Sequence, residues 1–256
     1  MLDGYSRYGD LIRMLVVKEF KVRYRNSALG FLWSLLNPLA MMVILTIFYT
    51  FVFSSSSIAN YPVFVLPALL AWRFFAIGTQ SSLDAIAGNS ALVTKVYFPR
   101  ILLVLSGNLA NAIGSTLEFI ALMPLMIVLG LRLTVFSLLL PVILVLEFIL
   151  IFGLSLLLSS VSVFYRDFNQ IWEILLQAGF FLSPIFYSQD LIPSSMLTVY
   201  SLNPVERIVV ATRQVLYYGG PPTAIDFAGL MLSGLLLLGI GLLAFRHFEE
   251  RFGELV

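Results

Sequence analysis

Cysteine is absent from the 256-residue chain, and histidine occurs once, at His247. Thiolate and imidazole groups are the usual ligands of structural zinc and iron–sulfur sites, and a disulfide needs two cysteines. The sequence therefore gives no support to a metal site, a disulfide framework or thiol catalysis. The formal net charge is +1, so no bulk positive field favours nucleic acid as a partner.

Charged residues are also scarce, at 11% of the chain, and none lies between Asn26 and Trp72. A bilayer core is about 30 Å thick and takes about 20 helical residues to cross, so this stretch is long enough for two crossings. The mean hydropathy is +0.98. No alternating ten-residue barrel pattern occurs, which leaves helices as the spanning element. The chain is predicted to be an all-α polytopic membrane protein.

Apolar runs between charges and turn formers predict six transmembrane helices in one domain that covers 1–256. The predicted helices are Leu29–Phe53, Val63–Ser82, Ile101–Gly130, Val135–Val163, Asn169–Tyr187 and Phe227–Phe245. Spans one to five thus lie within 29–187, and span six covers 227–245. Six spans place both termini on one side, which holds eleven of the Lys and Arg residues against three in the opposite loops. The positive-inside rule predicts that both termini are cytoplasmic.

The N-terminal segment 1–26 carries an amphipathic pattern ahead of the first span. At 100° per residue two stripes form, one charged and one apolar. The charged stripe holds Asp10, Arg13, Lys18, Lys21 and Arg25, and the apolar stripe holds Leu11, Ile12, Leu15, Val16 and Phe20. We expect a helix lying in the cytoplasmic membrane interface. A plain charged anchor is the alternative.

The loop from Asp84 to Arg100 is predicted to be cytoplasmic and unusually apolar. Asn89–Ser90 is a candidate helix N-cap and Pro99 a stop signal, so one short helix should lie between them. Its predicted exposed apolar side chains are Leu92, Val93, Val96 and Tyr97. Such a surface indicates docking to a partner. A tight turn packed against its own spans is the alternative.

The segment 188–222 is far longer than the other outward loops. Pro193, Pro204 and the run Gly219–Pro222 divide it into two short helices. The expected helices are Ser194–Leu202 and Val205–Tyr218. Both are too short to span and rich in apolar residues, which predicts two re-entrant helices before the last span. A water-exposed outer cap is the alternative.

Catalytic signatures are missing. No Gly-Lys pair occurs anywhere in the chain, so the phosphate-binding P-loop is absent. Glu118 and Glu147 lie far apart in the sequence and do not indicate an acid–base pair, and His247 reads as an interfacial anchor. These absences give little support to catalysis by this chain, and they exclude ATP hydrolysis through a P-loop.

Asn108, Asn111, Ser115 and Glu118 recur at steps of three, four and three, and form one polar stripe on the third span. Two interpretations stay open, a hydrated path and hydrogen bonding between helices. Aromatic residues make up 14% of the chain and gather near span ends, where an interfacial belt is expected. A lining for sugar rings is the alternative role of these aromatics.

Five segments then match a known family in order. They are RYRNSALGFLWSLLNP, YPVFVLPALLAWRFF, LVTKVYFPR, FYRDFNQIWEILLQAGFFLSPIFY and LNPVERIVVATRQVL. Together they resemble the polysaccharide-exporting type-2 ABC permeases, which include O-antigen, teichoic-acid and capsule exporters. The resemblance is strongest to the O-antigen type and runs from about Arg23 to Pro222.

This resemblance implies a homodimer that pairs with two separate ATPase subunits in the bacterial inner membrane. ATP and Mg would bind to the ATPase, so this chain needs no cofactor of its own. The implied substrate is a polysaccharide linked to an undecaprenyl carrier, passing between protomers along aromatic side chains. The loop Asp84–Arg100 would be the coupling helix. By resemblance, motion would be transmitted by Leu92, Thr94, Lys95, Tyr97, Phe98 and Arg100.

Arg166 and Asp167 match the family's second cytoplasmic turn. A local ion pair and a further contact with the ATPase are the two interpretations. Arg73, beside Trp72, is a hypothesis for holding the carrier's pyrophosphate or the glycan. The candidate conduit residues are Trp72, Arg73, Asn108, Asn111, Glu118, Phe181 and Tyr187.

Three other functions compete with this prediction. An ABC exporter of another lipid or a drug would share the same plan. A polytopic glycan-polymerising or glycan-transferring enzyme would need acidic or histidine residues clustered at one membrane face. An ion-coupled carrier would show broken helices in both halves of the chain, whereas here they are expected only once.

Overall fold

The computed structural model describes residues 2–24, 30–52, 58–96, 98–193, 195, 200 and 203–255, and within these ranges it is helical with no strand. The longer helices are α1 (Leu2–Tyr24), α2 (Leu32–Val52), α3 (Tyr61–Ser82), α5 (Ile101–Val128), α6 (Leu140–Phe164), α7 (Phe168–Leu182), α9 (Pro204–Leu216) and α10 (Ala224–Glu249). The shorter elements are η1 (Ala87–Asn89), α4 (Ser90–Lys95), η2 (Val135–Leu139), η3 (Gln189–Leu191) and α11 (Phe252–Leu255). The predicted all-α class is confirmed.

Within the described residues, five helical segments are long and apolar enough to cross a membrane. They are α2, α3, α5, η2 with α6, and α10. The expected fifth span, Asn169–Tyr187, is shorter in the structure because α7 ends at Leu182. Ser183 precedes Pro184 and has extended backbone angles (φ −98°, ψ 145°), since a residue before proline avoids the helical region. The 15 residues of α7 cover only about 22 Å, so a sixth crossing stays a prediction.

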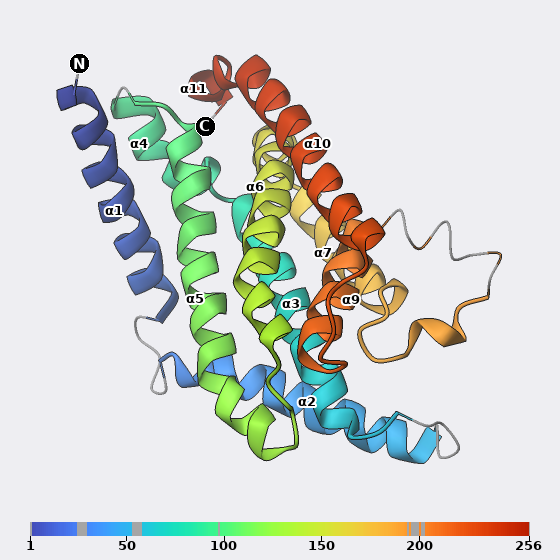
Figure 1. Ribbon diagram of the computed structural model, residues 1–256. Coiled ribbons are helices and arrows are strands. Elements are labelled where there is room, and N and C mark those ends of the chain that lie inside the picture. Colours follow the sequence, from blue (N-terminus) through green and yellow to red (C-terminus); the bar gives the residue numbers. More distant parts are fainter. Residues whose placement is uncertain are drawn as a thin grey trace.

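Helix α3 is the centre of the bundle. It packs against α2, α5, α6, α7 and α9, and Figure 1 shows it behind α5 and α6. Its residues Phe64–Leu66 and Ala68–Ala71 are almost completely buried. A helix that is apolar on all sides is expected at such a position, because every face then contacts another helix.

Helices α6 and α10 approach each other more closely than any side chain would allow. A Cβ on Gly153 would overlap the backbone of Leu237 and Leu238, and one on Gly241 would overlap the carbonyl of Gly153. Small residues at such crossings let two backbones pack directly, which stabilises helix pairs in lipid. This is the closest glycine contact that the structure gives between spans.

The first two helices differ from the expected arrangement. Helix α1 lies alongside α5 with a similar inclination, rather than flat across one end of the bundle (Figure 1). Leu15 of its apolar stripe is buried in a cluster that includes Leu103 and Val104. The predicted amphipathic pattern is present, but its apolar side meets a protein helix, because periodicity does not distinguish a lipid surface from a neighbouring helix.

Helix α2 runs across one end of the bundle, as Figure 1 shows. Tyr49 stacks on Tyr61 with ring centroids 4.0 Å apart, which attaches the C-terminal part of α2 to α3. Much of its remaining surface is exposed and apolar, for example Ile44 and Phe51.

The two ends of the bundle carry different segments. The two termini lie at the same end as α4 (Figure 1). At the other end, Thr134 Oγ1 donates to the carbonyl of Gly219 (3.2 Å) and Ser137 Oγ to that of Val215 (3.3 Å). The shared end for both termini agrees with the predicted topology, and its position on the cytoplasmic side stays a prediction.

The segment 188–222 contributes one well-packed helix. The side chain of Asn203 caps α9 by accepting from the amide of Val205 (3.0 Å), and α9 packs on α3, α6 and α10. The helix is thus part of the bundle rather than a water-exposed cap. The other expected helix, Ser194–Leu202, lies almost entirely outside the described residues.

Candidate functional site

The loop Asp84–Arg100 is the point at which most elements of one bundle end meet. Lys18 of α1 donates to Asn89 Oδ1 (2.7 Å), and Asn169 of α7 donates to Asp84 Oδ1 (3.4 Å). Ser162 of α6 donates to the carbonyl of Leu83, just before the loop. The loop therefore contacts α1 and α7, and the residue just before it contacts the spanning helix α6.

One short helix lies between Asn89 and Pro99, as predicted, and this helix, α4, begins at Ser90 and ends at Lys95. Asn89 occupies the N-cap position, but its side chain bonds to Lys18 and to the carbonyl of Ala85 (3.0 Å) instead of capping. Val93 was expected to be exposed and is buried, because it joins a cluster with Phe252 of α11. Val96 is exposed, as predicted.

The predicted coupling residues divide into outward and inward groups. Thr94 and Lys95 are exposed, while Leu92 and Phe98 pack partly on the cluster around Val93. Arg100 bonds to Glu249, at the end of α10. Tyr97 lies outside the described residues.

Arg166 and Asp167, in the turn between α6 and α7, are both exposed. No ion pair between them is found in the described part of the chain. The backbone carbonyl of Asp167 accepts from the amide of Gln170 (3.1 Å) at the start of α7. A contact between this turn and a partner stays a prediction.

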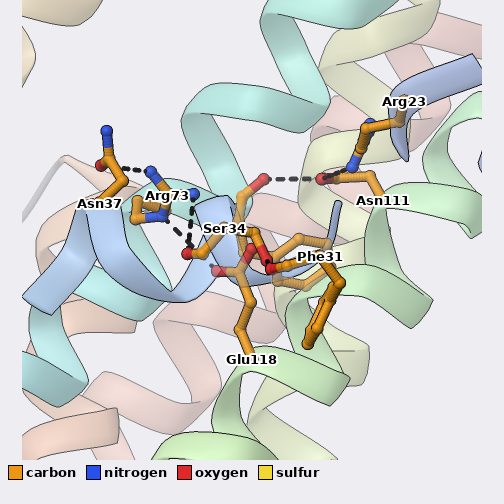
Figure 2. A network of polar contacts seen from close by, with 8 residues as sticks. Arg23, Phe31, Ser34, Asn37, Arg73, Asn111 and Glu118 are labelled. Atoms are coloured by element: carbon orange, nitrogen blue, oxygen red, sulfur yellow. Dashed lines mark hydrogen bonds and ion pairs between the residues drawn. The ribbon is translucent and has the colours of Figure 1, made fainter. Parts of the chain in front are cut away.

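A second group of polar residues lies inside the bundle, between α2, α3 and α5 (Figure 2). Arg73 Nε lies 3.5 Å from Glu118 Oε2, and Arg73 Nη1 donates to Asn37 Oδ1 (2.6 Å). The carbonyl of Ser34 is 3.5 Å from Nη2. The guanidinium of Arg73 thus donates through Nη1 and Nη2, while its Nε is paired with Glu118 by charge and has no hydrogen-bond partner among the described residues.

The polar stripe on α5 is buried and faces neighbouring helices. Asn111 donates to the carbonyl of Phe74 (2.9 Å) and accepts from Arg23 Nη1 (3.1 Å), as Figure 2 shows. Asn108 accepts from Ser155 Oγ of α6 (3.2 Å). In this structure the stripe therefore joins α5 to α1, α3 and α6, and its role along a hydrated path stays a prediction.

Gly78 makes this contact between helices possible. A Cβ there would lie 2.7 Å from both Asn111 Nδ2 and Ile151 Cγ2, so any other residue would force these two side chains to move. The predicted polar side chains and a glycine on α3 thus form one packing unit.

The predicted aromatic residues belong to one continuous row. Trp72 of α3 meets Phe180 edge to face (5.9 Å), and Phe180 meets Phe181 (5.5 Å). A further ring, Phe186, connects Phe181 (5.9 Å) to Tyr187 (5.0 Å). Trp72 is buried, whereas Phe181 is 65% exposed. The row therefore leads from the bundle core to an open face of α7.

Arg213 is a buried cation that the sequence analysis placed in an outward loop. It is 3% exposed, stands over the ring of Phe64 (3.6 Å), and donates to the carbonyls of Pro184 and Ile185 (both 2.9 Å). Burial lowers the pKa of Arg213 to about 10, so the side chain stays charged at neutral pH. Its spacing of four from Val209, on the apolar face of α9, is the signal that would have indicated burial.

The two isolated carboxylates do not meet. Glu118 pairs with Arg73, while Glu147 of α6 is fully buried with both oxygens lacking a hydrogen-bond partner among the described residues. No group of three or more metal-ligating side chains occurs in the described ranges.

Comparison with known proteins identifies the family. The sequence model of the ABC-2 type transporter family matches residues 10–217, so the chain belongs to that family. An O-antigen export system permease protein, RfbA of Klebsiella pneumoniae, is 30% identical over 96% of this chain and 95% of its own length. RfbA of Myxococcus xanthus is 31% identical over 97% of this chain and 96% of its own length. The polysialic acid transport protein KpsM of Escherichia coli is 25% identical over 97% of this chain and 97% of its own length. The predicted family is confirmed.

Proposed function

We propose that this chain is the membrane permease subunit of an ABC exporter of O-antigen polysaccharide. The observation that carries the proposal is the near-full-length similarity, at 30% identity, to a protein named for O-antigen export. The relatives named for polysialic acid or capsule export are 23–26% identical, which favours O-antigen over capsule polysaccharide.

The energy for export comes from a separate ATPase in this proposal, which binds ATP and Mg. The lack of a Gly-Lys pair supports this, because a P-loop requires one. The loop Asp84–Arg100 is the docking site for that ATPase. Its exposed Lys95 and Val96 lie at the end of the bundle, and its first half is bonded to helices α1 and α7.

Two copies of the chain enclose the passage. Helix α7 supports this part of the proposal, because Ile171, Ile174 and Phe181 are more than half exposed. A second copy facing α7 would cover these side chains and line the space with the aromatic row, whose ring faces suit sugar C–H groups. The substrate is an undecaprenyl-linked polysaccharide. The setting is the inner membrane with both termini cytoplasmic, which the distribution of Lys and Arg supports.

Co-purification tests the partner. The tagged chain, co-expressed with the ATPase, should retain it, and replacing 84–100 by Gly and Ser residues should release it. A matched replacement of the opposite loop, 131–134, should leave the complex intact. An ATPase that stays bound after the first replacement, or export by the chain alone without ATP, would contradict the proposal.

Complementation tests the substrate. Cells that lack their own O-antigen permease should regain surface O-antigen when this chain and its ATPase are supplied. The same test in cells that lack a capsule permease is the comparison. If the chain restores capsule there and does not restore O-antigen in the first cells, it belongs with the capsule exporters.

A further inference from the structure

The C-terminal end of α10 is hydrogen-bonded to Arg100, the last residue of the loop Asp84–Arg100. The backbone amide of Arg100 donates to Glu249 Oε1 (3.1 Å), and Arg100 Nη1 donates to the main-chain carbonyl of Glu249. Arg100 is the N-cap residue of α5, where backbone amides have no partner inside the helix. A carboxylate at that position satisfies one amide and interacts favourably with the helix dipole. Glu249 of one helix thus caps another.

An apolar contact lies beside this cap. Phe252 of α11 is fully buried, meets Phe245 of α10 edge to face (5.3 Å), and shares a cluster with Val93 and Ile86. The loop and α4 therefore rest on the end of α10 through an apolar contact as well as a polar one. Lys18 and Asn169 each provide one hydrogen bond from α1 and α7, and Leu15 of α1 and Val163 of α6 join the same apolar cluster.

Helix α10 is in turn packed directly on α6. The backbones of Gly241 and Gly153 touch with no side chain between them, so the two helices resist sliding or separating. A displacement of α4 at the bundle end therefore reaches α10, and α10 can pass it to α6.

We propose that Glu249 is a positioning residue of the loop, and that it adds α10 to the helices through which loop motion enters the membrane. This inference rests on the proposed function, since it assumes that a partner ATPase moves the loop. Glu249 itself lies beyond residue 217, where the match to the family model ends.

The experiment uses the full chain with its ATPase in proteoliposomes and measures polysaccharide exported per ATP hydrolysed. Glu249→Ala should lower this ratio about tenfold, the size of a typical coupling energy, while complex yield and ATP hydrolysis persist. Glu249→Gln keeps an acceptor oxygen and should restore the ratio to within about threefold, because only the charge interaction with the helix dipole is lost. Glu250→Ala, at the exposed neighbouring position, is the matched control and should behave as the wild type.

A second measurement reports how mobile the loop is in the absence of the ATPase. The chain has no cysteine, so Lys95→Cys accepts a single nitroxide label. The label should become more mobile in the Glu249→Ala background and stay ordered in the Glu249→Gln and Glu250→Ala backgrounds. Wild-type vesicles that fail to export O-antigen would count against the proposed function, and the label would still test the positioning role.

Three results would overturn the inference. The first is a label and an export ratio in Glu249→Ala that match those of Glu250→Ala. The second is a lower yield of the complex that accounts for the lower export, while the polysaccharide exported per ATP hydrolysed is unchanged. Glu249 would then have only a structural role. The third is failure of Glu249→Gln to restore the ratio.

Discussion

Arg73 on α3 and Glu118 on α5 form an ion pair inside the bundle, with Nε and Oε2 3.5 Å apart and side chains only 18% and 6% exposed. Removing one partner leaves the other charge buried and unpaired, so Arg73→Met or Glu118→Leu alone should lower the free energy of unfolding by about 3–5 kcal/mol. The double variant should recover most of this loss. Tryptophan fluorescence during thermal unfolding in detergent measures the difference, because the chain has three Trp residues.

Export by the double variant then separates the two roles of Arg73. If Arg73 holds the carrier's pyrophosphate, the stable double variant should assemble with the ATPase and fail to export. Normal export by that variant would show that Arg73 acts only as the partner of Glu118.

Gly153 should tolerate no larger residue, because its position faces the backbone of α10. We expect Gly153→Val to separate α6 from α10 and to lower the apparent unfolding temperature by about 5 °C or more. Gly239→Ala is the control, since nothing lies within 4 Å of its Cβ position. Equal stability of the two variants would contradict the close crossing.

Arg213 should not be replaceable by lysine, although the charge is kept. Its planar guanidinium donates to the carbonyls of Pro184 and Ile185 at once while it stands over Phe64, and a lysine ammonium cannot reproduce that geometry. We expect Arg213→Lys to cost about 2–3 kcal/mol, measured as a lower unfolding temperature. The exposed Arg132→Lys should show no change.

The stability of the fold should depend on pH through Glu206 on α9. Burial is the main reason that the pKa of this carboxyl is raised above its ordinary value of 4.5. The protonated form therefore stabilises the fold, and that stability is present below pH 4.5 and lost as the pH rises through the raised pKa. Glu206→Gln, which keeps the oxygen that accepts from Gln189 Nε2, should unfold at a higher temperature than the wild type at pH 8 and at the same temperature at pH 4.

The matched control for this pH dependence is Glu173→Gln, at an exposed position on α7. It should not alter the unfolding temperature at either pH. A wild type that is more stable than Glu206→Gln at pH 8 would contradict the assigned direction of the shift.

Residue pattern alone predicts those helices whose ends carry local signals. Helix α5 starts at Ile101, directly after Pro99 and Arg100, and α4 starts at Ser90, both as expected. Hydropathy also identified α3 to within two residues, because its end at Ser82 precedes a charged loop. These boundaries follow from local chemistry, which a single sequence contains.

The remaining features depend on contacts between distant segments. The sequence overextended the fifth span because hydropathy continues past Ser183, whereas the helix ends before Pro184. It counted Arg213 among the cations of the outward loops, since the carbonyl groups of Pro184 and Ile185 that surround it come from another segment of the chain. The contact between Glu249 and Arg100 joins positions 149 residues apart, which no local pattern indicates.

Nucleotide turnover by the purified chain, compared with export by the reconstituted complex, tests the central claim most directly. The chain alone should hydrolyse no ATP, and vesicles that also contain the partner ATPase should move lipid-linked polysaccharide only when ATP is supplied. ATP hydrolysis by the isolated chain, or ATP-independent export from vesicles without the ATPase, would contradict the account.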